Sequence, residues 1–122
     1  MTVAPVVLSA WPTPLQPAPR LAAALGLHAG DLWIKRDDLT DFGGGNKVRK
    51  LEHLLAAALA DGATVLVTSG GAQSNHARMT AAAAARLGLR AVLVLGGSPD
   101  ASRPGNLALE QLLGAEVVVP RG

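Results

Sequence analysis

The sequence predicts an α/β fold: a parallel sheet with helices on both faces, arranged in three layers. One unit, formed by a helical pattern, a glycine and a short run of β-branched residues, recurs three times. The strand-length runs are almost wholly apolar, as in parallel strands that are buried on both faces. The 122 residues are 49% hydrophobic and 16% charged, which is enough for a modest core. Helix–strand alternation of this kind implies right-handed crossovers.

The composition excludes several classes of protein. There is no cysteine, so a disulfide scaffold, a thiolate metal site and thiol redox chemistry are excluded, and a reducing, cytoplasmic location is expected. With 2% aromatic residues and a formal charge of +2, nucleic acid is not an expected partner. The chain has no apolar run of about 18 residues, so no membrane span is expected. Its apolar start lacks a basic region and is followed by prolines, unlike a signal peptide.

The first part of the chain is rich in proline. Residues 1–20 are therefore expected to form an extended arm, because each proline also keeps its predecessor out of the helical region. A short helix is predicted over residues 19–25, with Gly26 at its end. A strand over residues 31–36 and a loop over residues 37–45 follow.

The remaining chain supplies the three repeats of helix, glycine and strand. The first predicted helix, residues 46–61, has Val48, Leu51, Leu55 and Leu59 on one face. All three helices end at a glycine that precedes a strand. The predicted helices are residues 46–61, 74–87 and 104–113, and the predicted strands are residues 64–68, 91–95 and 116–119. No linker is visible, so residues 1–122 are interpreted as a single α/β unit.

Ligands of open α/β sheets lie beyond the carboxyl ends of the strands. The informative loops are therefore residues 37–45, 69–73 and 96–103, each of which leads from a strand to a helix. Two of them are rich in glycine and open onto helix N-termini, where free N–H groups favour an anion. A phosphate is the first ligand expected. Neither G-x-G-x-x-G nor G-x-x-x-x-G-K-[ST] occurs, which weakens the case for NAD or ATP.

The motif G-G-G-N-K-V-R-K places Lys47 at the start of a helix and Lys50 one turn later. The helix start, Arg49 and Lys50 all disfavour a positive charge on Lys47 and so increase its fraction of free amine. A free amine can form a Schiff base with a carbonyl compound. The alternative is that Lys47, Arg49 and Lys50 form a solvated basic face, and the pattern leaves both interpretations open.

The second motif, T-S-G-G-A-Q-S-N-H over Thr68–His76, joins a buried strand to a helix. Ser74 or Asn75 is expected to cap this helix. A serine hydroxyl and an asparagine amide could also transfer a proton and donate to a ligand oxygen. His76 is expected on the helix surface.

Two further groups of residues favour structural roles. The three histidines, at positions 28, 53 and 76, lack the spacing of metal ligands, so no metal is expected. Asp37 and Asp38 could be paired catalytic carboxylates, but Lys35 and Arg36 adjoin them and favour ion pairing.

Three motifs in order resemble one family. They are I-K-R-D-D (residues 34–38), G-G-N-K-V-R-K-L-E (residues 44–52) and Q-S-N-H (residues 73–76). They are similar to the N-terminal part of the D-cysteine desulfhydrase and 1-aminocyclopropane-1-carboxylate (ACC) deaminase family. These are pyridoxal-phosphate enzymes of the tryptophan-synthase-β fold, known as fold type II. The resemblance extends from about Pro12 to the end of the chain.

The resemblance implies a role for each candidate residue. Lys47 would carry pyridoxal phosphate covalently and later act as a base, and Ser74 would face the α-carbon of the substrate. Asn75 would bond the 3-oxygen of the cofactor, and Lys50 would lie near its phosphate. The implied enzyme is a lyase that converts D-cysteine to pyruvate, ammonia and hydrogen sulfide. The alternative is ACC deaminase, which yields 2-oxobutanoate and ammonia, although the K-R-D-D and Q-S-N-H forms are more similar to the desulfhydrase branch.

The resemblance also bears on the extent of the chain. Family members are much longer, and their phosphate cup and pyridine-nitrogen partner lie beyond the position of Gly122. We therefore expect an N-terminal fragment of a longer homodimeric enzyme, with an incomplete fold. An alternative from another class is a truncated, inactive phosphate-binding module.

Overall fold

The computed structural model describes residues 3–97 and 105–120. Two compact units are present. The larger contains the described parts of residues 1–8 and 47–122, and the smaller is residues 9–46. The repeated helix–strand pattern lies in the larger unit.

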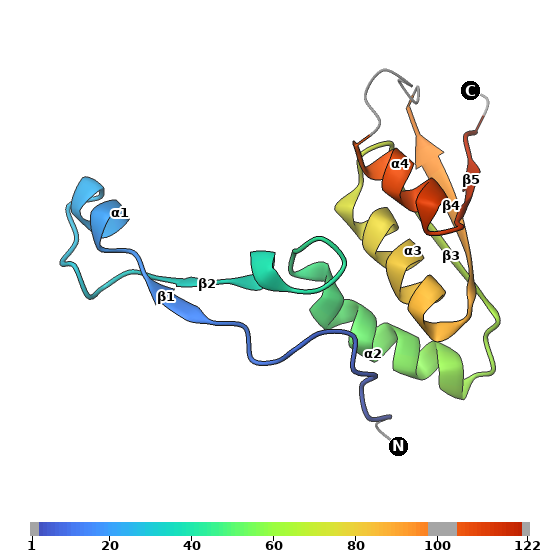
Figure 1. Cartoon of the computed structure of the whole chain (residues 1–122), viewed down its shortest axis with the longest axis horizontal. Coiled ribbons are helices and arrows are strands. Elements are labelled where there is room, and N and C mark those ends of the chain that lie inside the picture. The colour runs from blue at the N-terminus through green and yellow to red at the C-terminus, as the bar shows by residue number, and fades with distance from the viewer. Residues whose placement is uncertain (1–2, 98–104, 121–122) are drawn as a thin grey trace. The chain divides into compact units, whose positions relative to one another are not determined.

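The larger unit is built on a three-stranded parallel sheet, which confirms the predicted α/β class with a parallel sheet (Figure 1). The strand order is β3-β4-β5, so successive strands are neighbours. Leu66 of β3 lies opposite Ala91 of β4, and Leu93 of β4 lies opposite Val117 of β5. The strands are β3 (Val65–Gly71), β4 (Arg90–Gly96) and β5 (Glu116–Val118), and the helices are α2 (Lys47–Ala60), α3 (Asn75–Leu87) and α4 (Gly105–Leu112).

The core lies where α3 packs against β3 and β4. Ala81–Ala84 are all buried, and their small side chains let the helix approach the sheet closely. Along β4, Ala91, Leu93 and Leu95 are buried, whereas the residues between them are half-buried. In β3, Val67 is 69% exposed. The apolar composition predicted burial on both faces, whereas burial in these two strands alternates between residues.

The helices end close to the glycines that the sequence predicted as helix ends. Helix α3 ends at Gly88, whose left-handed backbone (φ 70°) lets its N–H bond the last carbonyls of the helix. The predicted loop 96–103 and the start of the third helix at Pro104 lie largely outside the described residues. No described helix has the length and apolar character needed to cross a membrane.

The start of the chain is bound to the helices of the larger unit. The Val6 N–H donates to the carbonyl of Glu52 (3.0 Å), and the Leu8 N–H donates to a carboxylate oxygen of the same residue (2.8 Å). The Arg86 guanidinium donates to the Leu8 carbonyl (3.0 Å). Leu8 is fully buried, so this part of the predicted arm is an ordered part of the core.

The smaller unit contains an antiparallel pair, β1 (Leu15–Pro17) and β2 (Trp33–Lys35). Between them lies α1 (Pro19–Ala24), which begins with proline as predicted. The segment predicted as a loop contains a 3₁₀ helix, Asp37–Leu39. Its last turn is closed by the Thr40 hydroxyl, which donates to the Asp37 carbonyl (2.9 Å). Such short-range closure leaves no hydrophobic periodicity in the sequence.

Candidate functional site

Ser74 caps the start of helix α3 and is one of the two capping residues that the sequence predicted. Its extended backbone (φ −67°, ψ 120°) leaves the hydroxyl free to accept a hydrogen bond from the Ala77 N–H (3.2 Å). Gly70 lies directly against this residue: a Cβ atom at position 70 would be 2.7 Å from both Cβ and Oγ of Ser74. The absence of a side chain at Gly70 therefore leaves the space that the Ser74 hydroxyl occupies.

Asn75 is the first residue of α3, and its side chain joins a polar network with α4. Its Oδ1 accepts from Nδ2 of Asn106 (3.0 Å) and, at 3.5 Å, from Nη2 of Arg78. Asn106 also donates from its backbone N–H to Oε1 of Gln73 and from Nδ2 to the Gln73 carbonyl, both at 2.9 Å. Neither Asn106 nor Arg78 belongs to a motif that was recognisable in the sequence. Asn106 could have been noticed in the sequence because it follows a glycine at the start of the third predicted helix.

Lys47 and Lys50 lie in the first turn of α2, where Lys47 is half-buried and Lys50 is exposed. Their charges act on His76 of α3. The pKa of His76 is lowered, first by burial and then by the positive charges of Lys50 and Lys47. Helices α2 and α3 thus bring both lysines into electrostatic range of the second motif.

His76 itself differs from the expected surface histidine. The side chain is half-buried, and its Nδ1 atom is buried without a hydrogen-bond partner among the described residues. It lines a hollow of about 240 Å³ formed with residues of α2, β3 and α3, including Leu55, Thr68 and Thr80. A buried ring nitrogen without a partner, in a residue that lines a hollow, marks a candidate ligand site.

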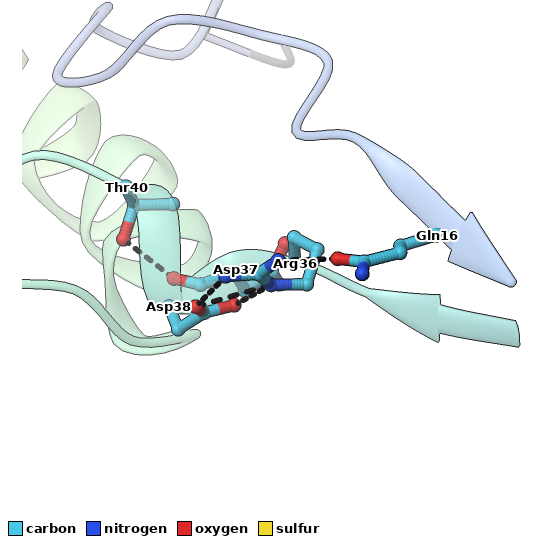
Figure 2. Close-up of polar contacts among 5 residues, drawn as sticks. All are labelled: Gln16, Arg36, Asp37, Asp38 and Thr40. Atoms are coloured by element: carbon cyan, nitrogen blue, oxygen red, sulfur yellow. Dashed lines mark hydrogen bonds and ion pairs between the residues drawn. The ribbon is translucent and has the colours of Figure 1, made fainter. Parts of the chain in front are cut away.

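The acidic pair of the first motif forms a separate site within the smaller unit. Arg36 donates from Nε (2.8 Å) and Nη2 (2.7 Å) to the Asp38 carboxylate and also bonds Gln16 (Figure 2). The guanidinium lowers the pKa of Asp38, and Asp38 in turn raises the pKa of Arg36. Asp37 accepts from the Thr13 hydroxyl (2.7 Å). The predicted ion pairing is confirmed for Arg36 and Asp38.

The chemistry of the donor set in the larger unit indicates which ligand would fit. The primary amine of Lys47 can bond covalently to an aldehyde, and the basic first turn of α2 favours an anionic group. Asn75 supplies an amide that can donate to an acidic oxygen. These residues fit pyridoxal phosphate, which carries an aldehyde, a phenolic oxygen and a phosphate.

The fold and this donor set correspond to a known class. The model of the family described as pyridoxal-phosphate dependent enzyme matches residues 6–122, and the chain belongs to this family. The cofactor of the family is therefore pyridoxal phosphate.

Two curated relatives and one solved structure are similar to this chain over most of its length. A 1-aminocyclopropane-1-carboxylate deaminase of Burkholderia cenocepacia is 47% identical over 117 residues, which cover 90% of this chain and 34% of the relative. A D-cysteine desulfhydrase of Salmonella paratyphi B is 55% identical over 85 residues, covering 69% of this chain and 25% of the relative. A crystal structure of an ACC deaminase homologue matches with a TM-score of 0.87 and 46% identity, over 98% of this chain and 35% of that chain. The chain spans about a third of the length of the curated relatives it matches.

Proposed function

We propose that this chain contributes the cofactor-holding lysine of a pyridoxal-phosphate-dependent lyase that acts on a small amino acid. The preferred substrate is D-cysteine. The observation that carries the proposal is the arrangement of Lys47 in the first turn of α2, within electrostatic range of His76 in the helix that Ser74 caps. Membership of the pyridoxal-phosphate family supports the assignment of the cofactor.

Each candidate residue has a defined task in this proposal. The Lys47 amine holds the cofactor and, once released by the substrate amine, accepts the α-proton. The Ser74 hydroxyl lies on the side of the substrate α-carbon. The Asn75 amide donates to the cofactor 3-oxygen, and the Lys50 ammonium attracts its phosphate. When bound, the cofactor supplies the electron sink for the carbanion.

The proposed reaction consumes D-cysteine and water. Loss of the α-proton and cleavage of the Cβ–S bond release sulfide, which leaves as hydrogen sulfide. Water then hydrolyses the remaining three-carbon enamine, after its conversion to an imine, to pyruvate and ammonia. The 55% identity to a protein named D-cysteine desulfhydrase supports this substrate.

ACC deamination is the second candidate. It is supported by the 46% identical ACC deaminase homologue whose structure covers 98% of this chain. A substrate panel separates the two: D-cysteine should yield pyruvate and sulfide, whereas ACC and water should yield 2-oxobutanoate and ammonia. Formation of neither set of products would contradict both substrates and leave the cofactor assignment to be tested separately.

Replacement of the lysine tests the cofactor assignment. The protein is mixed with pyridoxal phosphate, reduced with borohydride and digested, and the labelled peptide is identified by mass spectrometry. We expect the label on Lys47 and its loss in Lys47→Ala, with Lys35→Ala as the control that keeps it. A label that persists in Lys47→Ala would overturn the proposal. Reversible binding of phosphate compounds with no label would favour a non-enzymatic phosphate-binding module.

The proposal extends to assembly and location. A homodimer follows from the resemblance to the family, and light scattering of the purified protein would detect it. A cytoplasmic location is supported by the absence of cysteine.

A further inference from the structure

The side-chain amide of Asn75 is held in one orientation by two donors, Asn106 of α4 and Arg78 of α3. Nδ2 of Asn106 donates to its Oδ1 at 3.0 Å, and Nη2 of Arg78 approaches the same atom at 3.5 Å. Both partners are donors, so the oxygen end of the amide must face them. The Nδ2 end is consequently the one left to donate in another direction.

The orientation of Asn106 is itself fixed. Its backbone N–H donates to Oε1 of Gln73, and its Nδ2 also donates to the Gln73 carbonyl, both at 2.9 Å. The space at this contact is tight, since a Cβ atom on Gly105 would lie 2.3 Å from Oε1 of Gln73. An Asn106 amide rotated by 180° would place its Oδ1 against the Gln73 carbonyl oxygen, which is also an acceptor. Asn106 is therefore held as a donor toward Asn75.

A buried acid lies near the second donor. Arg78 is 5% exposed, and Glu110 of α4 is fully buried, with neither carboxylate oxygen accepting a hydrogen bond among the described residues. Burial raises the pKa of Glu110, whereas the positive charge of Arg78 acts to lower it. The carboxyl of Glu110 thus lies within electrostatic range of Arg78.

We infer that Asn106 is a positioning residue, which with Arg78 turns the Asn75 amide so that its N–H group faces the cofactor 3-oxygen. The inference rests on the proposed cofactor role of Asn75. An acidic oxygen requires a donor, and an Asn75 amide turned the other way would present a second acceptor to it. Helix α4 would therefore act on the cofactor through Asn75.

The test uses Asn106→Asp, which has the same shape but replaces the donor with a carboxylate. Asp is favourable in the first turn of a helix, so α4 should remain folded. Nδ2 of Asn75 should then turn toward the new carboxylate. In ¹H–¹⁵N spectra of the full chain without cofactor, the side-chain amide signals of Asn75 should shift and exchange more slowly with water. The dissociation constant for pyridoxal phosphate, measured by absorbance titration, should rise about tenfold.

Two further variants complete the test. Asn106→Ala removes the donor without adding an acceptor, so it should free the Asn75 amide and weaken cofactor binding less than Asn106→Asp. Gln111→Glu makes the same amide-to-acid change at an exposed position of α4 and should leave both readouts unchanged. Unchanged Asn75 signals in Asn106→Asp, or equal effects of Asn106→Asp and Gln111→Glu, would overturn the inference. Failure of the wild-type protein to bind pyridoxal phosphate would overturn the proposed function, while the spectra would still decide whether Asn106 orients Asn75.

Discussion

At the scale of single residues, His76 reports on the charge environment of the candidate site. Its imidazole is half-buried near two lysines, so the protonated form is disfavoured by burial, by Lys50 and by Lys47, in that order. The neutral form of the ring is therefore favoured. A neutral imidazole with a buried Nδ1 atom can donate or accept one hydrogen bond without adding a further positive charge.

This environment predicts how His76 titrates. Lys50→Met removes the larger of the two charge effects, so the pKa of His76 should rise toward the ordinary value of about 6.5. Lys47→Met should raise it less. NMR titration of the imidazole ring of His76 measures both shifts, and Arg49→Met on the same helix is the control. An unchanged pKa in Lys50→Met would show that burial alone causes the shift.

The lowered pKa of His76 also determines in which direction this residue makes the free energy of unfolding change with pH. Below about pH 6.5 the unfolded chain protonates this histidine, whereas the folded chain resists protonation because its pKa is lowered. The unfolded state then binds more protons, so the contribution of His76 makes the free energy of unfolding fall as the pH drops from about 6.5 to the folded pKa. Above that window His76 contributes no pH dependence.

Individual residues also mark what the sequence could and could not predict. Ser74 was predictable as a possible cap because its partner, the N–H of Ala77, is three residues away. Asn106 was not singled out because its partner Asn75 is 31 residues away, on another helix. Polar contacts between distant elements depend on the packing of α3 against α4, which no local pattern encodes.

At the scale of elements, glycines and apolar periodicity located every helix and strand of the larger unit within a few residues. The largest boundary difference is at β3, which continues to Gly71 beyond the predicted end at residue 68. The extension results from pairing, since Gly70 lies opposite Leu95 and Gly71 opposite Gly96 in the parallel ladder. Intrinsic preference disfavours glycine in a strand, and here the neighbouring strand overrides it.

The junction between β3 and α3 provides a matched pair of substitutions. Gly70→Ala would place a Cβ atom 2.7 Å from Ser74, so the serine must move and its bond to the Ala77 N–H weakens. We expect the free energy of unfolding to fall by about 1–3 kcal/mol. In Gly71→Ala the new Cβ atom would have no other atom within 4 Å, so the free energy of unfolding should change by less than about 0.5 kcal/mol. Urea denaturation of both variants measures the difference, and equal effects would show that α3 does not depend on the close approach of Gly70.

At the scale of the whole molecule, the two units have unequal cores. The larger unit buries leucine, valine and methionine side chains from its helices and strands, among them Val48, Met79 and Leu93. Throughout residues 9–46, all of which the structure describes, the buried side chains are small: Ser9, Thr13, Ala22 and Thr40. A two-stranded antiparallel sheet with so little buried apolar surface is only marginally stable.

This inequality predicts that the two units open with different free energies. In native-state hydrogen exchange, amides of β1 and β2 should exchange at least tenfold faster than those of β4, because local opening exposes less apolar surface. Ala22→Gly tests whether the units open separately. It weakens α1 by about 1 kcal/mol and should speed exchange within residues 9–46 while leaving β4 unchanged. Equal acceleration in β4 would show that the chain opens as one cooperative unit, so that the stability of the site around Lys47 would depend directly on the smaller unit.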